Sequence, residues 1–192
     1  MSNESTQMQQ INERELNDLC FNGESDYDAG FNADPNCKEC NDQTLRCDNP
    51  EHYGGLQIWQ IADESLYICN ANRIVNNEQE IKIKIDYCVN ETQIFSFRKD
   101  SGFTVLDVAF CIYASYRFCY KDDEPSEEHL LEGNTINEIL SNLSARHNRE
   151  NLITGERITT GKIETNCHIM HDLYLEGCTE IELGFYELQI GS

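Results

Sequence analysis

Apolar and polar side chains alternate without a break over residues 81–89, which read IKIKIDYCV. A side-chain period of two places successive residues on opposite faces of a β-strand. One face here is apolar and the other carries Lys82, Lys84 and Asp86. The pattern therefore predicts a half-buried antiparallel strand, and QIFSF after the short polar turn at Asn90 and Glu91 completes a predicted hairpin.

The apolar period then changes from 2 to 3.6. Residues 104–118, TVLDVAFCIYASYRF, begin with Thr104 and Asp107 at the spacing of a capping box, which predicts a helix start. Residues 134–148, NTINEILSNLSARHN, begin in the same way with Thr135 and Glu138. Between them, KDDEPSEEHLLEG places acids and a proline where a helix N-terminus favours them. The sequence thus predicts two or three helices in the middle of the chain.

Short apolar stretches on both sides of these helices predict further strands. They are LQIWQI at 56–61, SLYICN at 65–70, LITGERITTGKIE at 152–164 and IELGFYELQI at 181–190. In the third stretch we expect Gly155 and Gly161 to mark turns. The order of strands, helices and strands predicts an α+β fold, an antiparallel sheet with two or three helices packed on one face.

The N-terminal part of the chain has a different composition. Its first 52 residues hold twelve Asp and Glu against three Lys and Arg and show little apolar periodicity. Only INERELNDLCF, residues 11–21, has the spacing of a short amphipathic helix. We therefore divide the chain into an irregular, acidic N-terminal arm at residues 1–53 and an α+β domain at residues 54–192.

Three stretches of the domain share motifs with a known family: FTVLDVAFCIYASYR, the Arg of SARHNRE, and HIMHDLYLEGCTEIELGFYELQIG. Together they resemble a domain of unknown function common in basidiomycete fungi. That family runs from a TV-x-DV helix start through a helical Arg to a D-x-L-x-x-x-x-F-x-G-L strand and a short final strand. The likeness covers residues 56–191, although the second Gly-Leu half reads LEGCTE here. The resemblance implies this fold and no particular activity.

The net charge of the chain limits the classes of molecule that it can bind. Thirty-five Asp and Glu against 14 Lys and Arg give a net charge of -21 and a pI near 4.4. We therefore expect no direct nucleic-acid binding, because it requires clustered Lys and Arg. We therefore predict a non-enzymatic acidic interaction or structural protein that binds a basic protein surface, in one form as a nucleic-acid mimic. Acidity that only maintains solubility is the alternative.

Ten cysteines would suggest a disulfide framework in a secreted protein. The start MSNESTQMQQINERE resembles no secretory signal, and no apolar stretch is long enough to span a membrane. We therefore expect an intracellular protein, cytoplasmic or nuclear, with reduced thiols and no membrane contact. Four cysteines in apolar segments are then predicted to pack as small hydrophobic residues: Cys69, Cys88, Cys111 and Cys119.

Residues 37–52, CKECNDQTLRCDNPEH, hold a set of four metal-ligand types: Cys37, Cys40, Cys47 and His52. Structural zinc takes four such ligands, and a Cys-x2-Cys turn places two sulfurs on one ion. We therefore predict zinc as a cofactor of the N-terminal arm. An exposed reduced loop and a redox-active CKEC motif remain as alternatives, the second disfavoured because Glu39 would raise a thiol pKa.

A second cluster, NCHIMHDLYLEGC at 166–178, carries Cys167, His168, His171, Asp172 and Cys178. A Cys/His pair from it is the basis of the alternative function, a thiol-dependent enzyme. In a strand, however, the two histidines would point to opposite faces. We therefore favour core or surface placement for these side chains. No phosphate-binding glycine motif is present, and the densest acidic run, residues 122–128, is expected to form a solvated helix start.

Overall fold

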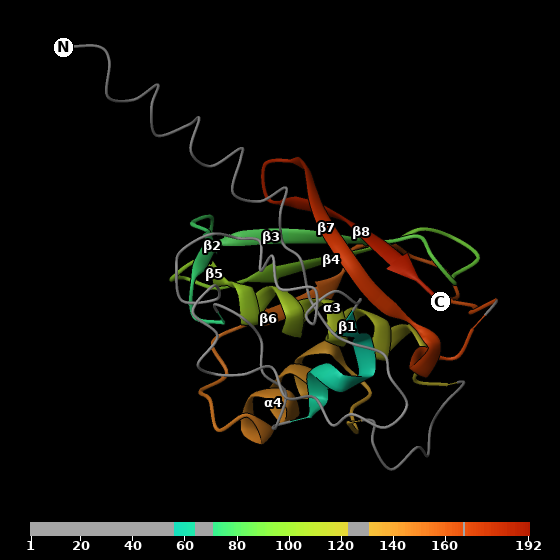
Figure 1. Cartoon of the computed structure of the whole chain (residues 1–192), viewed down its shortest axis with the longest axis horizontal. Coiled ribbons are helices and arrows are strands. Elements are labelled where there is room, and N and C mark those ends of the chain that lie inside the picture. Colours follow the sequence, from blue (N-terminus) through green and yellow to red (C-terminus); the bar gives the residue numbers. More distant parts are fainter. Residues whose placement is uncertain (1–55, 64–70, 123–130, 167) are drawn as a thin grey trace, which may run out of the picture.

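The computed structural model describes residues 56–63, 71–122, 131–166 and 168–192 (Figure 1). It contains two helices packed on one side of a six-stranded sheet, which confirms the α+β fold class. The N-terminal arm with its predicted helix, the strand predicted at 65–70 and most of the helix predicted at 121–133 lie outside the described residues. None of the helices in the described ranges combines the length and apolar content that crossing a membrane requires.

The main sheet has the strand order β1-β7-β8-β3-β4-β6. Its strands are β1 (Leu56–Gln57), β3 (Glu80–Ile85), β4 (Gln93–Arg98), β6 (Thr154–Arg157), β7 (Tyr174–Glu182) and β8 (Phe185–Gly191). All neighbours run antiparallel except β3 and β8, which are parallel. A separate pair, β2 (Ile74–Asn76) and β5 (Phe103–Thr104), runs antiparallel beside the start of the first helix. The sheet is thus mixed at one point, where the sequence predicted antiparallel pairing only.

Strand β3 forms where the alternation predicts a strand, but it ends at Ile85 and does not extend to Val89. Ile81, Ile83 and Ile85 have no solvent exposure, while Lys82 on the opposite face is exposed. Opposite the first two of these isoleucines on β4 are Phe97 and Phe95, which are also fully buried. Aromatic and β-branched side chains paired across strands stabilise an antiparallel ladder. The predicted hairpin is therefore confirmed and supplies the centre of the core.

Helix α3 (Val105–Cys119) begins at the predicted capping box. The Thr104 hydroxyl accepts a hydrogen bond from the Asp107 backbone N–H, and the Asp107 carboxylate accepts one from the Thr104 backbone. All residues of the helix except Phe118 are buried. A helix that is buried all round needs neighbours on every side. The sheet, helix α4 and the 3-10 helix η2 (Ile58–Ala62) provide them (Figure 1).

Helix α4 (Ile136–Arg146) also begins at its predicted capping box, formed by Thr135 and Glu138. The backbone N–H groups of Asn134 and Thr135 donate to the Glu138 carboxylate and lower its pKa. The helix buries a stripe formed by Ile136, Ile139, Leu140 and Leu143. It packs against α3 and against the edge strand β6.

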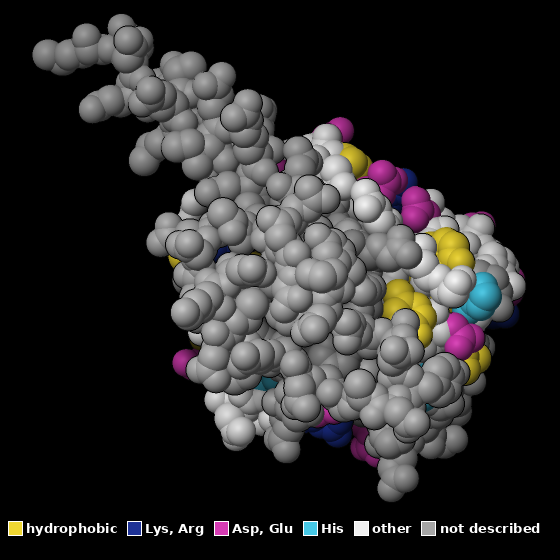
Figure 2. Space-filling model, viewed as in Figure 1, with side chains coloured by type: hydrophobic (Ala, Val, Ile, Leu, Met, Phe, Trp, Pro, Cys, Tyr) yellow, Lys and Arg dark blue, Asp and Glu magenta, His cyan; other side chains and the backbone are white. Residues whose placement is uncertain are grey.

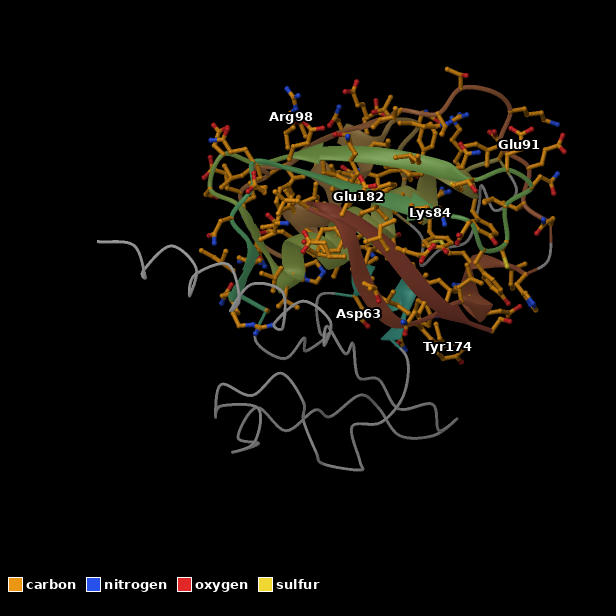
Figure 3. The ribbon with its side chains drawn as sticks, turned by 90° about the horizontal axis from the view of Figure 1, so that it is seen from above. Asp63, Lys84, Glu91, Arg98, Tyr174 and Glu182 are labelled. Atoms are coloured by element: carbon orange, nitrogen blue, oxygen red, sulfur yellow. The ribbon has the colours of Figure 1, made fainter. Side chains whose placement is uncertain are left out.

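The second face of the sheet carries charged side chains. Figure 3 looks onto this face and shows Lys84 and Arg98 above the strands. Lys84 forms an ion pair with Glu187 across the parallel β3/β8 pair, and Arg98 pairs with Glu80 across β4 and β3. Opposite charges on neighbouring strands favour the pairing of these strands, although solvent screens exposed pairs such as these. The described helices therefore cover one face only, and ion pairs connect the strands on the other.

Several predicted strand boundaries are wrong. The apolar stretch at 56–61 is a strand only over β1 and then continues as η2, whose Ile58 and Ile61 are fully buried. Gly155 lies within β6 rather than in a turn. The stretch at 181–190 is interrupted at Gly184, whose φ of 70° allows the tight turn between β7 and β8.

Candidate functional site

The predicted zinc ligands Cys37, Cys40, Cys47 and His52 lie outside the described residues. Within the described ranges, no group of three or more His, Cys, Asp and Glu side chains is arranged to hold a metal ion. Zinc binding by the N-terminal arm therefore remains a prediction, and metal analysis of the purified full-length protein is its direct test.

The structure describes every residue of the second predicted cluster except Cys167. His171 lies within the 3-10 helix η3 (Met170–Asp172), and His168 precedes this helix. His168 stacks on Tyr87 with 6.4 Å between ring centroids, whereas His171 makes an edge contact with Trp59 at 4.9 Å. The two imidazoles thus contact different parts of the fold. The sequence analysis expected them to be separated because they would point to opposite faces of a strand, whereas here they are separated by their positions before and within η3. They do not form one site.

A serine, a histidine and an aspartate come together beside η3. Ser192 Oγ lies 3.2 Å from His168 Nε2, and His168 Nδ1 lies 3.9 Å from Asp172 Oδ2. The same sequence of groups occurs in hydrolase triads, where a buried carboxylate orients the imidazole. The His168–Asp172 distance is too long for a hydrogen bond, and these two side chains are 39% and 54% exposed. The arrangement therefore does not support a nucleophilic serine.

The described thiols are poorly suited to catalysis. Cys178 is buried on β7, and burial raises its pKa. Burial also raises the pKa of Cys111, and that of Cys119 to about 12. A reactive cysteine needs the opposite, a lowered pKa and solvent access. The alternative of a thiol-dependent enzyme consequently depends on Cys167, and the packing role predicted for Cys111 and Cys119 agrees with their burial.

Cys88 differs from its prediction as a reduced packing thiol. It is buried and disulfide-bonded, and its partner lies outside the described residues. Its backbone has a φ of 61°, a value that residues other than glycine adopt infrequently. A disulfide is the state that oxidising compartments favour. The prediction that Cys88 is a reduced thiol is therefore wrong for this structure, and the intracellular location stays a prediction.

The excess of acids is unevenly distributed along the chain. The described residues hold eighteen Asp and Glu against eleven Lys and Arg, so most of the net charge of -21 belongs to the other segments, including residues 123–128 of the predicted acidic run. On the described surface, carboxylates pair with several of the cations: Lys84, Arg98, Lys99 and Lys162. The surface that remains open to a partner is therefore acidic.

The turn between β7 and β8 combines acids with exposed apolar side chains. Leu183 is 79% exposed and Ile181 is 45% exposed. Glu180 and Glu182 lie beside them, and Glu180 accepts a hydrogen bond from the Gly184 backbone N–H. Figure 2 shows acidic side chains along the upper right edge of the molecule, where β7 and β8 lie in Figure 1. We call residues 180–183 the hairpin tip.

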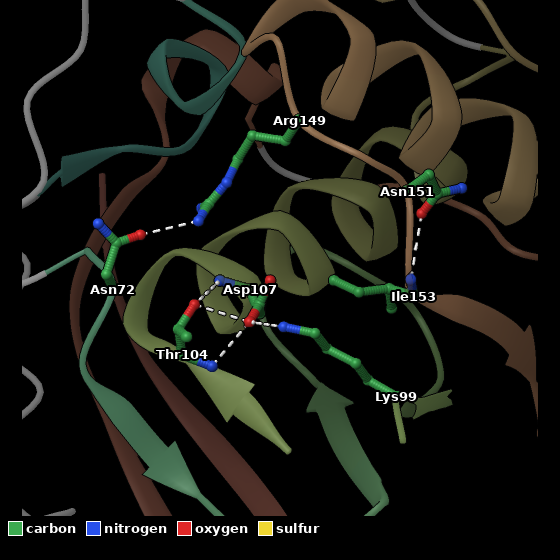
Figure 4. A network of polar contacts seen from close by, with 7 residues as sticks. All are labelled: Asn72, Lys99, Thr104, Asp107, Arg149, Asn151 and Ile153. Carbon is green, nitrogen blue, oxygen red and sulfur yellow. Dashed lines mark hydrogen bonds and ion pairs between the residues drawn. The ribbon is translucent and has the colours of Figure 1, made fainter. Parts of the chain in front are cut away.

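A polar network surrounds the start of α3 (Figure 4). Asp107 accepts hydrogen bonds from the Thr104 backbone and hydroxyl and forms an ion pair with Lys99. Arg149, in the segment after α4, donates to Asn72 Oδ1 at 2.8 Å. The capping-box spacing predicted the Thr104–Asp107 contact, but no local signal in the sequence connected Lys99 or Arg149 with it.

No protein-family model, curated protein or solved structure matches this chain. The resemblance to the fungal domain of unknown function thus remains a prediction.

Proposed function

We propose that this protein is a non-enzymatic acidic interaction protein that binds a basic protein partner through the hairpin tip. The observation that carries the proposal is the exposure of Leu183 and Ile181 between acids. Large apolar side chains exposed together often mark a contact surface. The neighbouring carboxylates favour a partner whose own surface is basic.

The negative charge of the surface alone would indicate only that the partner is basic, not which basic protein binds. An acidic surface accelerates association with any basic molecule and discriminates little between partners. Apolar side chains at the centre of the contact add the short-range part of the affinity, which depends on shape. The hairpin tip supplies both components within four residues, whereas most of the remaining acidic charge lies outside the described residues.

The proposal retains two further predictions. Mimicry of a nucleic acid is one form of it, in which the acids occupy the groove of a nucleic-acid-binding protein. The intracellular location, cytoplasmic or nuclear, is the other, and the state of Cys88 in the cell bears on it directly.

The test measures association rates with a Lys- and Arg-rich peptide and with a neutral peptide of equal length. We expect rates for the basic peptide to fall steeply between about 50 and 200 mM salt, because exposed charges are screened over a Debye length of roughly 10 Å. The double variant Glu180→Gln and Glu182→Gln should slow association several-fold, since rim charges act mainly on the encounter rate. Leu183→Ser should instead accelerate dissociation.

The matched control is Glu91→Gln with Glu156→Gln. Both residues are exposed, belong to no salt bridge in the described structure and lie away from the hairpin tip. It removes the same charge and should leave the rates nearly unchanged. Equal losses in the two double variants would show diffuse attraction and contradict a specific surface. Unchanged rates in all variants would leave acidity as a means of solubility.

A further inference from the structure

A cavity of about 270 Å³ opens beside the polar network at the start of α3. Lys99, Asp107 and Ser144 line one part of it, and Arg149 comes from the segment after α4. Phe110 and Ile153, both buried, and Leu152, which is 52% exposed, supply the apolar part. Pockets for drug-sized ligands measure roughly 300 to 1,000 Å³. This cavity therefore suits a smaller molecule.

The charges within the cavity are not equally available to a ligand. Lys99 and Asp107 neutralise each other, and both side chains are only 11% exposed. Asp107 is further occupied as the helix cap, with the Thr104 backbone and hydroxyl as donors. Glu150, the other acid that lines the cavity, is exposed. Because Lys99 and Asp107 are buried and paired with each other, Arg149 is the cation in the cavity lining that is available to a ligand.

Some N–H groups of the Arg149 guanidinium are not used in hydrogen bonds within the protein. Its Nη2 donates to Asn72, while its buried Nη1 has no hydrogen-bond partner. No carboxylate of the described residues forms a salt bridge with it. A buried N–H without a partner is unfavourable, and a guanidinium offers parallel N–H groups that match a carboxylate. An anion in the cavity would satisfy this group.

We infer that the cavity binds a small organic carboxylate with a short apolar chain. The carboxylate accepts hydrogen bonds from the Arg149 guanidinium, and the chain packs on Phe110 and Leu152. A compact inorganic anion would leave the apolar wall unused, and an apolar molecule would leave the guanidinium unpaired. This site is separate from the hairpin tip and does not depend on the proposed function.

Three six-carbon probes with different head groups test this inference: hexanoate, hexanol and hexylamine. Each is titrated into isotope-labelled full-length protein while backbone amide signals are followed by NMR. We expect hexanoate to shift signals of residues 148–153 and of the start of α3. Hexanol should bind at least about tenfold more weakly, because a hydrogen bond to a charged group contributes about 1.5–3 kcal/mol. Hexylamine should not bind there.

Substitution of Arg149 provides the second comparison. Arg149→Gln should weaken hexanoate binding by about tenfold or more, and Arg149→Lys should retain part of it. Arg98→Gln is the control, since Arg98 is an exposed arginine on the other face of the sheet. It should leave hexanoate affinity unchanged. Thermal unfolding of each variant establishes that the fold is intact.

If Arg149→Gln fails to fold, Leu152→Asp replaces it, because this half-exposed side chain can be changed with little effect on the core. The new carboxylate at the rim should abolish hexanoate binding. Equal affinities for hexanoate and hexanol, shifts confined to other regions, or unchanged binding after substitution of Arg149 or Leu152 would overturn the inference. The absence of any shift at millimolar hexanoate would overturn it as well.

Discussion

Cys178 illustrates how burial decides the chemistry of a residue whose sequence context leaves two roles open. In the sequence it belongs to a cluster with His168 and His171 that resembles a catalytic set. In the fold it occupies β7 opposite Leu188 of β8, without access to solvent. The desolvated thiolate is disfavoured there, which raises the pKa of the thiol. Its position assigns it to packing.

We expect Cys111, Cys119 and Cys178 to resist a thiol reagent at pH 8 in the folded protein and to react fully in urea. Raised pKa values and burial both protect them. Mass mapping of labelled peptides reads each site separately, and Cys88 should label only after reduction. Rapid labelling of Cys178 without denaturant would contradict its placement in the core.

The same thiols predict how stability depends on alkaline pH. The pKa of Cys119 is about 12 in the folded state against an ordinary value of 9.0. Between these values the folded protein binds more protons than the unfolded chain, so stability falls as pH rises. Urea unfolding at pH 7, 9 and 10 should show a loss that begins near pH 9. Cys119→Ala should have a shallower decline.

At the scale of elements, the close approach of β6 to the core depends on Gly155. A Cβ at this position would lie 2.6 Å from the Phe97 ring and 2.8 Å from Ile136 of α4. Both neighbours are buried, so neither can move cheaply. We expect Gly155→Ala to lower the free energy of unfolding by about 1–3 kcal/mol, the usual cost of overpacking. Urea denaturation measures this loss.

Gly177 of β7 offers the matched control. A Cβ there would meet the end of the Gln189 side chain at 2.9 Å, and this exposed side chain can turn away. Gly177→Ala should therefore change stability by less than about 0.5 kcal/mol. A similar loss in both variants would indicate that the added methyl group acts through the strands themselves and not through contact with Phe97.

The elements that the sequence predicted well are those with complete local signals. β3 has strict alternation, and both helices have capping boxes at their first turns. The parallel β3/β8 pairing could not be predicted, because it joins residues 103 positions apart and leaves no local pattern. For the same reason Arg149 and Asn72 were not connected, since their contact exists only after the fold forms.

The misread stretch at 56–61 has a different cause. Ile58 and Ile61 are buried, but the chain turns into η2 and presents them to the core from a 3-10 helix. A short apolar stretch satisfies either conformation, and packing against α3 decides between them.

At the scale of the whole molecule, we expect residues 54–192 to fold without the N-terminal arm. Most segments with apolar periodicity lie within this range, and removal of residues 1–53 takes away twelve acids and three cations. The thermal midpoint of the shortened protein should stay within a few degrees of the full-length value. Circular dichroism with heating measures it.

A shorter fragment that begins at residue 64 serves as the control. It lacks β1 and η2, whose Ile58 and Ile61 have no solvent exposure. Loss of large buried side chains costs about 2–5 kcal/mol each, so this fragment should be unfolded or nearly so. Failure of the longer fragment to fold would show that the arm belongs to the domain and would move the boundary towards the N-terminus.

The place of β8 in the sheet has a consequence for synthesis in the cell. β8 lies in the middle of the strand order and separates β7 from β3, yet the ribosome delivers it about a hundred residues after β3. During that interval the β3 edge of the β3/β4 hairpin is unpaired, the state from which nascent chains aggregate. A fold closed by such distant pairing also forms slowly. We therefore expect its yield in translation to depend on chaperones more than its final stability would suggest.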